Sequence, residues 1–238
     1  MRLLGGFVIP IDQTFATPTP GLWLGSYLAE VVDLRDPEGQ ARVQVRLLNC
    51  DGVDDQNAPI WARMAVPLAG RNRGTFWIPD VGDEVLVTFV NGDARWPIIV
   101  GGLWNGRDMP PESMDSGGRN ELKVFRSRNG VTLTLDDHDG QERLALETPG
   151  GQQLTLKDGP GSIEIRDSNG NAVTLEPDGI TITAAAKVTV NASQVDIAAG
   201  MVTVSAGMSQ FSGVVQCQTL ITNAVVSSSY TPGAGNVW

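Results

Sequence analysis

From about residue 120 onward, the chain alternates apolar and polar residues in short phrases that repeat with few interruptions. Phrases such as QQLTLKDGPG, SIEIRDSNG and AVTLEPDG place two β-branched or leucine residues on either side of one polar residue. Each phrase predicts a short β-strand with one apolar and one polar face. Between Leu154 and Val202, the first apolar residues of successive phrases are 9, 10, 7, 8, 7 and 7 residues apart. A short and nearly fixed period is typical of stacked, similar units.

The apolar faces of these strands must be buried, and two quaternary structures would do so. In a single-chain β-solenoid, about three strands would form one coil and fill its own interior. In a trimeric β-prism, each chain supplies one strand to each face and wraps around its two partners. The period fits both, but the inward residues are slim, which favours a narrow trimeric core. The expected core residues are Leu154, Leu156, Ile163, Ile165, Val173, Leu175, Ile180, Ile182, Val188, Val190, Val195, Ile197, Val202 and Val204.

The first half of the chain, residues 22–104, contains short alternating segments joined by Gly, Asp and Pro turns. In one of them Val43, Val45 and Leu47 are expected to face a core. An Asn91-Gly92 pair between two apolar segments is a good hairpin turn. About five strands in fewer than about ninety residues predict a small closed barrel of the oligonucleotide/oligosaccharide-binding (OB) type.

Four phrases in this half carry a resemblance to a known family: VVDLRDPEGQARVQVRL, WARMAVPLAG, WIPDVGDEVLVTFVNGD and RWPIIVGGLWNG. The matching region covers residues 27–106 nearly continuously. It resembles the barrel domain of the central spike proteins of contractile phage tails, the baseplate assembly protein V-like family. The same barrel occurs in the spikes of type VI secretion systems and related injection particles. In that family a column of short repeats follows the barrel directly, as it does here.

The resemblance implies an all-β fold in which a small OB barrel precedes a trimeric, intertwined β-helix or β-prism. It leads to a division of the chain into five parts. These are an N-terminal arm (1–20), the OB barrel (21–105), a linker (106–120), a β-helical needle (121–226) and a distal tip segment (227–238).

In this family the barrel end faces the tail hub, so the N-terminal arm is expected to dock there, and a disordered leader is the alternative. The candidate hub-docking residues are Phe7, Ile9 and Phe15. There is no room for a hub domain before residue 22, so a separate hub protein is the expected partner. At the other end, three copies of the tip candidates would close the prism or seat a separate tip protein, and a frayed tail is the alternative. These tip candidates are Tyr230, Pro232 and Trp238.

The charge pattern excludes some functions. The formal net charge is −10, and residues 20–105 carry seven Arg and no Lys against eleven Asp and Glu. Nucleic-acid binding needs a basic surface that displaces counterions, so no nucleic-acid partner is expected. After Asp178 the charged residues are Lys187 and Asp196. Such a Ser, Thr, Ala and Val-rich stretch would be prone to aggregate unless it stacks into a column.

The sequence also bears on localisation. The start, MRLLGGFVIPID, is cut by Gly, Pro and Asp too early for a secretory signal, and no segment approaches the ~18 apolar residues of a membrane span. The protein is therefore expected to be made in the bacterial cytoplasm and to enter a virion tail baseplate or an equivalent injection particle. Cys50 and Cys217 fall in different predicted domains and are expected to be two free thiols.

Candidate catalytic residues are sparse. His138 is the sole histidine, and it stands among Asp136, Asp137 and Asp139. A metal site normally gathers more donors than one local turn supplies, so a solvated turn is expected. Some spikes of the family hold iron through a His-x-His pair near the C-terminus, and this chain has no histidine there. We expect no catalytic site, no metal and no cofactor.

The resulting prediction is a non-enzymatic homotrimeric central spike of a contractile-tail baseplate. It would attach to the tail hub and pierce the bacterial outer envelope when the sheath contracts. One alternative is a trimeric tail spike that binds or degrades host polysaccharide, although residues 179–229 offer few acids or aromatics for a sugar groove. Another is a single-chain β-solenoid adhesin.

Overall fold

The computed structural model describes residues 21–48 and 58–229 of the 238-residue chain. Within these ranges it contains fourteen β-strands and one short 3₁₀ helix, Val90–Gly92, labelled η1. The chain divides between Ala186 and Lys187 into two units, and every strand belongs to the first. The all-β composition agrees with the prediction from the sequence.

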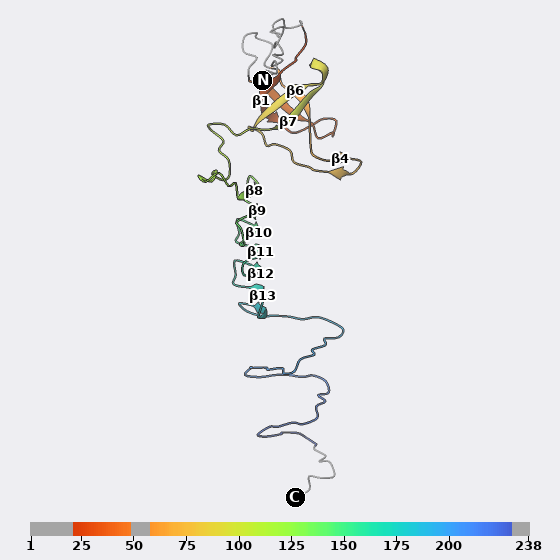
Figure 1. Ribbon diagram of the computed structural model, residues 1–238. Coiled ribbons are helices and arrows are strands. Elements are labelled where there is room, and N and C mark those ends of the chain that lie inside the picture. The colour runs from red at the N-terminus through yellow and green to blue at the C-terminus, as the bar shows by residue number, and fades with distance from the viewer. Residues whose placement is uncertain (1–20, 49–57, 230–238) are drawn as a thin grey trace, which may run out of the picture. The chain divides into compact units, whose positions relative to one another are not determined.

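Five strands of the first unit close into a barrel in the order β1-β2-β3-β7-β6 (Figure 1). Neighbouring strands are antiparallel except for β3 and β7, which are parallel. The barrel thus has no free edge, which removes a site of aggregation. Its strands are β1 (Ser26–Asp33), β2 (Val43–Leu47), β3 (Ile60–Met64), β6 (Glu84–Phe89) and β7 (Pro97–Gly102).

The barrel core follows from the alternation of the sequence. Val43 and Val45 are fully buried, and Leu47 packs against the same cluster, as predicted. Successive inward residues on the other strands complete the core: Ala29, Val31, Ala62, Val85, Val87, Phe89 and Ile99. Trp23 closes one side by stacking on Tyr27 and Phe89, with ring centroids 5.0 and 5.2 Å away. Tilted aromatic pairs at such distances add to the stabilisation from burial.

A turn of the barrel and a separate two-stranded hairpin show local constraints on the backbone. Asp36 accepts hydrogen bonds from the backbone N–H groups of Glu38, Gln40 and Arg42, and from the Arg42 guanidinium at 2.7 Å. This guanidinium holds the pKa of Asp36 well below its usual range. In the hairpin of β4 (Ala69–Gly70) and β5 (Arg73–Gly74), Gly74 has a φ of +146°.

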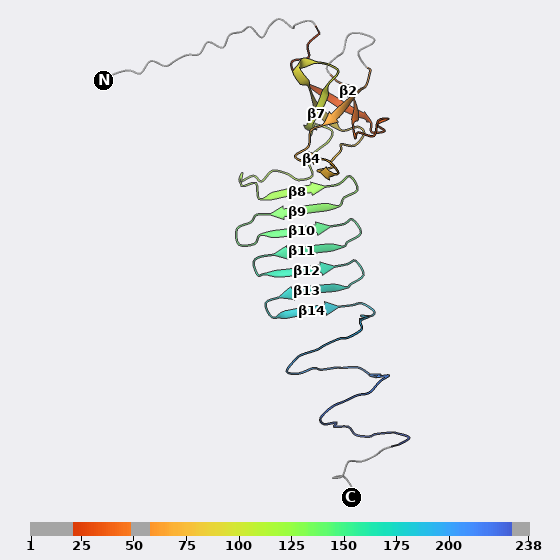
Figure 2. The ribbon, with the colours of Figure 1, turned by 90° about the vertical axis from the view of Figure 1, so that its right-hand side faces the viewer.

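The remaining seven strands form one antiparallel sheet in which each strand pairs with the next in sequence (Figure 2). Each has five residues, and glycines with positive φ, such as Gly130, Gly151 and Gly170, shape the connections. The strands are β8 (Leu122–Arg126), β9 (Thr132–Asp136), β10 (Arg143–Glu147), β11 (Gln153–Lys157), β12 (Ser162–Arg166), β13 (Ala172–Glu176) and β14 (Gly179–Thr183).

The second unit is built differently. From Lys187 to Ser229 the chain is extended and bent, and this described stretch contains no strand. Bends fall at Ser193, Gly200 and Gly207, seven residues apart. Further bends at Gly213, Gln218, Asn223 and Ser228 are five residues apart. The predicted repeats thus have two structures: hairpins up to Thr183, and an extended, bent chain from Lys187 onward.

Candidate subunit interface

The strand register of the sheet gathers large apolar side chains into two columns on one face. In the first column Leu154 lies opposite Ile165, and Ile165 lies opposite Val173. Residues that lie directly opposite each other project to the same side of a sheet. We call this side the apolar face. Its second column has the pairs Leu156 with Ile163, Ile163 with Leu175, and Leu175 with Ile180.

The central positions of the same strands project to the other side. Here Thr155 lies opposite Glu164, Glu164 opposite Thr174, and Thr174 opposite Thr181. This side is therefore polar along most of the sheet. The two faces differ as they would in a sheet with one face in a core and one in water.

Trp77 packs on Phe125 at the β8 end of the apolar face, but the far end of this face is open to solvent in the described chain. Ile165 is 53% exposed, Ile182 is 63% exposed and Ile180 is 70% exposed. A single-layer sheet cannot bury its own apolar side, and a contiguous exposed apolar surface marks a site of association. The face consequently needs a partner.

The second unit also needs a partner to cover its apolar side chains. The side chains of Val188, Val195 and Val202 are each about 60% exposed. The backbone of Lys187–Ser229 has no strand partner within the described residues. Backbone N–H and C=O groups are costly to bury unpaired, so they need partners from outside this chain if the segment is packed.

The structure thus places the predicted core residues in two groups. Eight of them, from Leu154 to Ile182, stand together on the apolar face. The other six, from Val188 to Val204, lie along the extended second unit. The sequence analysis missed earlier members of the same columns, although the Leu-x-Leu phrase is present there. These are Leu133, Leu135, Leu144 and Leu146.

Seven residues singled out from the sequence lie outside the described residues. They are the hub-docking candidates Phe7, Ile9 and Phe15, the tip candidates Tyr230, Pro232 and Trp238, and Cys50. Cys217 is exposed and forms no disulfide within the described part of the chain.

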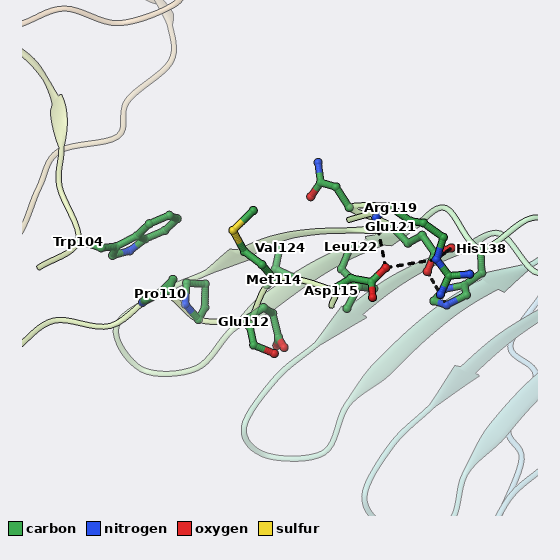
Figure 3. A pocket seen from close by; sticks show the side chains of 13 residues that line it. Trp104, Pro110, Glu112, Met114, Asp115, Arg119, Glu121, Leu122, Val124 and His138 are labelled. Atoms are coloured by element: carbon green, nitrogen blue, oxygen red, sulfur yellow. Dashed lines mark hydrogen bonds and ion pairs between the residues drawn. The ribbon is translucent and has the colours of Figure 1, made fainter. Parts of the chain in front are cut away.

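His138 has a more structured environment than a solvated turn (Figure 3). Its Nδ1 lies 2.6 Å from Oδ1 of Asp136, and its Nε2 lies 2.8 Å from Oε2 of Glu121. The hydrogen bond to Asp136 raises the pKa of His138, with the charge of Glu121 acting in the same direction. The hydrogen bond from His138 also lowers the pKa of Asp136.

Arg119 extends this arrangement into the linker. Its Nε lies 3.3 Å from Oε1 of Glu121 and 3.2 Å from Oδ2 of Asp115. Sequence separation hides these contacts, because Glu121 reaches His138 only through the pairing of β8 with β9. The Asp-x-His spacing of Asp136 and His138 is the one local signal that could have revealed part of this group of charged contacts.

The chemistry of this cluster is that of ion pairing. Across the described residues, no group of three or more His, Cys, Asp or Glu side chains is arranged to hold a metal ion. The carboxylates beside His138 are already engaged with His138, Arg119 and Arg143. In the same described ranges, no helix is long and apolar enough to cross a membrane.

The two structural parts correspond to two domains of known proteins. Residues 27–104 match the type VI secretion system/phage-baseplate injector OB domain. Residues 143–203 match the phage baseplate V C-terminal trimerisation domain. The second match spans both the apolar face from β10 onward and the first repeats of the extended unit. A barrel joined to a trimerisation domain defines the class of spike proteins of injection systems.

The chain belongs to the central spike family of contractile tails and related injection systems. Its relatives include type VI secretion system spike proteins of Pseudomonas aeruginosa. It is 28% identical to VgrG1c over 109 residues, which are 43% of this chain and 15% of that protein. It is 33% identical to VgrG4b over 113 residues, which are 46% of this chain and 14% of that protein.

A relative from Vibrio cholerae, the actin cross-linking toxin VgrG1, is 28% identical over 95 residues. This region is 39% of the present chain and 9% of the toxin. The chain thus matches only a small part of each of these relatives, and that part is the spike.

Proposed function

We propose that this protein is the homotrimeric, non-enzymatic central spike of a contractile-tail baseplate. It attaches to the tail hub and pierces the bacterial outer envelope when the sheath contracts. The single observation that carries the proposal is the uncovered apolar face, which lies within a domain that matches a trimerisation domain.

In the proposed trimer, the apolar faces of three chains meet around one axis. Three copies of Leu154, Ile165 and Val173 then form one continuous apolar core. Val188, Val195 and Val202 continue this core along the extended unit. Burying a side chain of this kind contributes ~1.5–3 kcal/mol relative to leaving it exposed. Ordering the backbone costs ~1–2 kcal/mol per residue, so a narrow column needs strand pairing and contacts between the chains in addition to this burial.

The proposed trimer also supplies hydrogen-bond partners for the unpaired backbone groups. Within the described residues, β14 offers a free strand edge, and the next segment, Lys187–Val190, has no strand partner. Strand edges pair readily with another extended chain. We therefore assign the partners of the extended unit to the two neighbouring copies, so that the hairpin sheet changes into an interwound column after Thr183.

The ends of the chain are assigned to partners within the particle. The N-terminal arm, with Phe7, Ile9 and Phe15, docks on the hub at the barrel end. The distal segment, with Tyr230, Pro232 and Trp238, closes the column or seats a separate tip protein. The protein is made in the bacterial cytoplasm and functions in the baseplate of the virion or injection particle.

An enzymatic role is not favoured. The part aligned to the actin cross-linking toxin is 9% of that toxin, so its printed activity is not transferred to this chain. A polysaccharide-degrading spike would need clustered acids and aromatics along the column. Residues 179–229 offer Asp196 and Phe211. A solenoid adhesin would need intrachain pairing of the repeats, and the extended unit has none within its described residues.

The proposal is tested first by the mass of the purified protein in light scattering. We expect a mass near three times 25.3 kDa, and a slow-migrating band for an unboiled sample on a denaturing gel. A monomer contradicts the trimer. The second test labels intact particles with an antibody for electron microscopy. Label along the sheath or on the fibres, rather than at the baseplate, contradicts the spike assignment while leaving the trimer standing.

A further inference from the structure

The imidazole of His138 lies between the carboxylates of Asp136 and Glu121, which belong to different parts of the fold; Figure 3 shows the side of Glu121. Glu121 ends the linker just before β8, and Asp136 is the last residue of β9. The side chains of these two acids are only 16% and 14% exposed. A protonated imidazole donates a hydrogen bond from each nitrogen, whereas a neutral one can donate only one. Both contacts are satisfied only when His138 is charged.

The contacts of His138 continue into the linker. Arg119 pairs with both Glu121 and Asp115, and Asp115 also accepts a hydrogen bond from the backbone N–H of Gly117 at 2.8 Å. On the sheet side, Arg143 lies 3.5 Å from Asp136. An unbroken chain of charged contacts thus runs from the linker to β10. We call it the His138 cluster; it consists of Asp115, Arg119, Glu121, Asp136, His138 and Arg143.

Apolar packing does not replace these contacts. A pocket of about 620 Å³ separates the linker residues Pro110–Met114 from Leu122 and Val124 of β8. Met114 is 92% exposed, so it contributes little to holding the linker. The charged cluster, together with the hydrogen bond that the backbone N–H of Asp137 donates to the carbonyl oxygen of Glu121 at 2.9 Å, attaches residues 115–121 to the sheet.

The charges around His138 favour its protonated form. Seven acids and three bases face it from the linker, β8, β9, β10 and the turn between the last two strands. They are Glu112, Asp115, Arg119, Glu121, Lys123, Asp136, Asp137, Asp139, Glu142 and Arg143. Lys123 is engaged with Asp137 at 2.6 Å and so does not oppose the charge of His138 directly.

We propose that the His138 cluster is a proton-dependent latch that holds the linker, residues 115–121, on the β9–β10 hairpin. The latch is closed when His138 is protonated and bridges Glu121 and Asp136. It weakens when the imidazole loses its proton, because one carboxylate then faces a ring nitrogen that cannot donate. This property goes beyond the proposed spike function and concerns the stiffness of the connection between barrel and needle.

The pH range of the latch follows from the raised pKa of His138 and the lowered pKa of Asp136. The pKa of His138 is raised by Asp136 and Glu121. The stabilisation is therefore full below the unfolded-state pKa of about 6.5, and it is lost as the pH rises through the higher folded-state value. The lowered pKa of Asp136 keeps its carboxylate charged below the usual range. The latch is thus closed below a pH of about 6.5 and opens as the pH rises through the folded-state pKa of His138.

The first test is a titration by nuclear magnetic resonance with histidine-labelled protein. The chain has a single histidine, so the signal belongs to His138. We expect a folded-state pKa above the value of about 6.5 that is typical of a free histidine. In the Glu121→Gln variant the pKa should move back toward that value. A wild-type pKa at or below about 6.5 would overturn the proposal.

The second test measures cleavage within residues 109–119 by a protease that cuts beside apolar residues. The full-length protein is compared with His138→Gln, and Asp178→Asn, in the exposed turn between β13 and β14 outside the cluster, is the matched control. At each pH the wild-type rate is divided by the rate of the variant, which removes the pH dependence of the protease itself. Light scattering confirms that each protein keeps the mass of the wild type.

We expect the linker of His138→Gln to be cut faster than the wild type at pH 6.5. We expect the difference between the two cleavage rates to be smaller by roughly fivefold or more at pH 9.5, because the wild-type latch opens. The Asp178→Asn control should follow the wild type throughout. Equal cleavage of the wild type and His138→Gln at pH 6.5, or a difference that stays constant with pH, would overturn the latch.

Discussion

Leu154 and Ile165 lie directly opposite each other across β11 and β12, on the face that the described chain leaves uncovered. We predict that Ile165→Asp abolishes the trimer, because three carboxylates would be brought to its core. A buried, unpaired charge costs several kcal/mol. The measurement is mass by light scattering, which should fall toward that of one chain.

The control for this substitution is Glu164→Gln, one residue away and on the opposite face. It should keep the mass of three chains, because the polar face remains in water. If Ile165→Asp remained a trimer, or if Glu164→Gln dissociated equally, the apolar face would not be the subunit interface.

The extended unit leads to a second prediction. Backbone amides between Lys187 and Ser229 should exchange with deuterated water about as slowly as those of β10–β13, although they have no strand partner among residues 21–48 and 58–229. Inter-chain pairing in the trimer would protect them. Hydrogen exchange read by mass spectrometry tests this. Exchange at the rate of an unstructured peptide would refute the interwound column while leaving the hairpin sheet unaffected.

The barrel core provides a third prediction. Ile99 is fully buried, whereas its neighbour Val100 is 52% exposed. Ile99→Ala should lower the free energy of unfolding by ~2–5 kcal/mol, since it removes buried methyl groups and leaves a cavity. Val100→Ala should change it by about 0.5 kcal/mol or less. Denaturant unfolding followed by tryptophan fluorescence compares the two, and equal effects would contradict the assigned core.

A fourth prediction concerns acid stability. In the β12–β13 turn, the side chain of Asn171, together with backbone N–H groups and Asn169, lowers the pKa of Asp167 to about 2. The charged carboxylate thus stabilises the turn above the ordinary pKa of about 3.9, and this contribution is lost as the pH falls through about 2.

Asp167→Asn should therefore unfold a few degrees earlier than the wild type at pH 6, and the deficit should largely disappear at pH 2. Melting curves by circular dichroism at both values measure it. The control is Asp178→Asn in the next turn, whose side chain forms no hydrogen bond in the described structure. A deficit of Asp167→Asn that stays the same at pH 2 would show that charge is not the cause.

The sequence predicted the strands well because their alternation is strict. Val43 and Val45 are buried as expected, and the all-β fold with barrel and trimerisation domain is confirmed. The period did not by itself reveal that the repeats have two structures. The turn residues do contain that signal: Gly-containing turns such as Asp178-Gly179 separate the strands up to β14, whereas the phrases from Lys187 onward follow each other every seven residues without hairpin turns.

The environment of His138 was not predictable from the local sequence. Its turn is rich in acids, and such turns are usually solvated. The partner that matters, Glu121, is 17 residues away and is brought close by the pairing of Leu122 with Asp136. Long-range strand register, rather than residue type, therefore creates the cluster. The hub-docking and tip assignments stay predictions.

The bends of the extended unit have a mechanical consequence. They are seven residues apart up to Gly207 and five residues apart from Gly213 onward. At ~3.3 Å per residue, the straight stretches shorten from about 23 Å to about 16 Å. If these stretches form the sides of a triangular cross-section, its area falls by about half toward the leading end. If the protein acts as the proposed spike, the same thrust would act on half the membrane area at this end, and the local pressure would double.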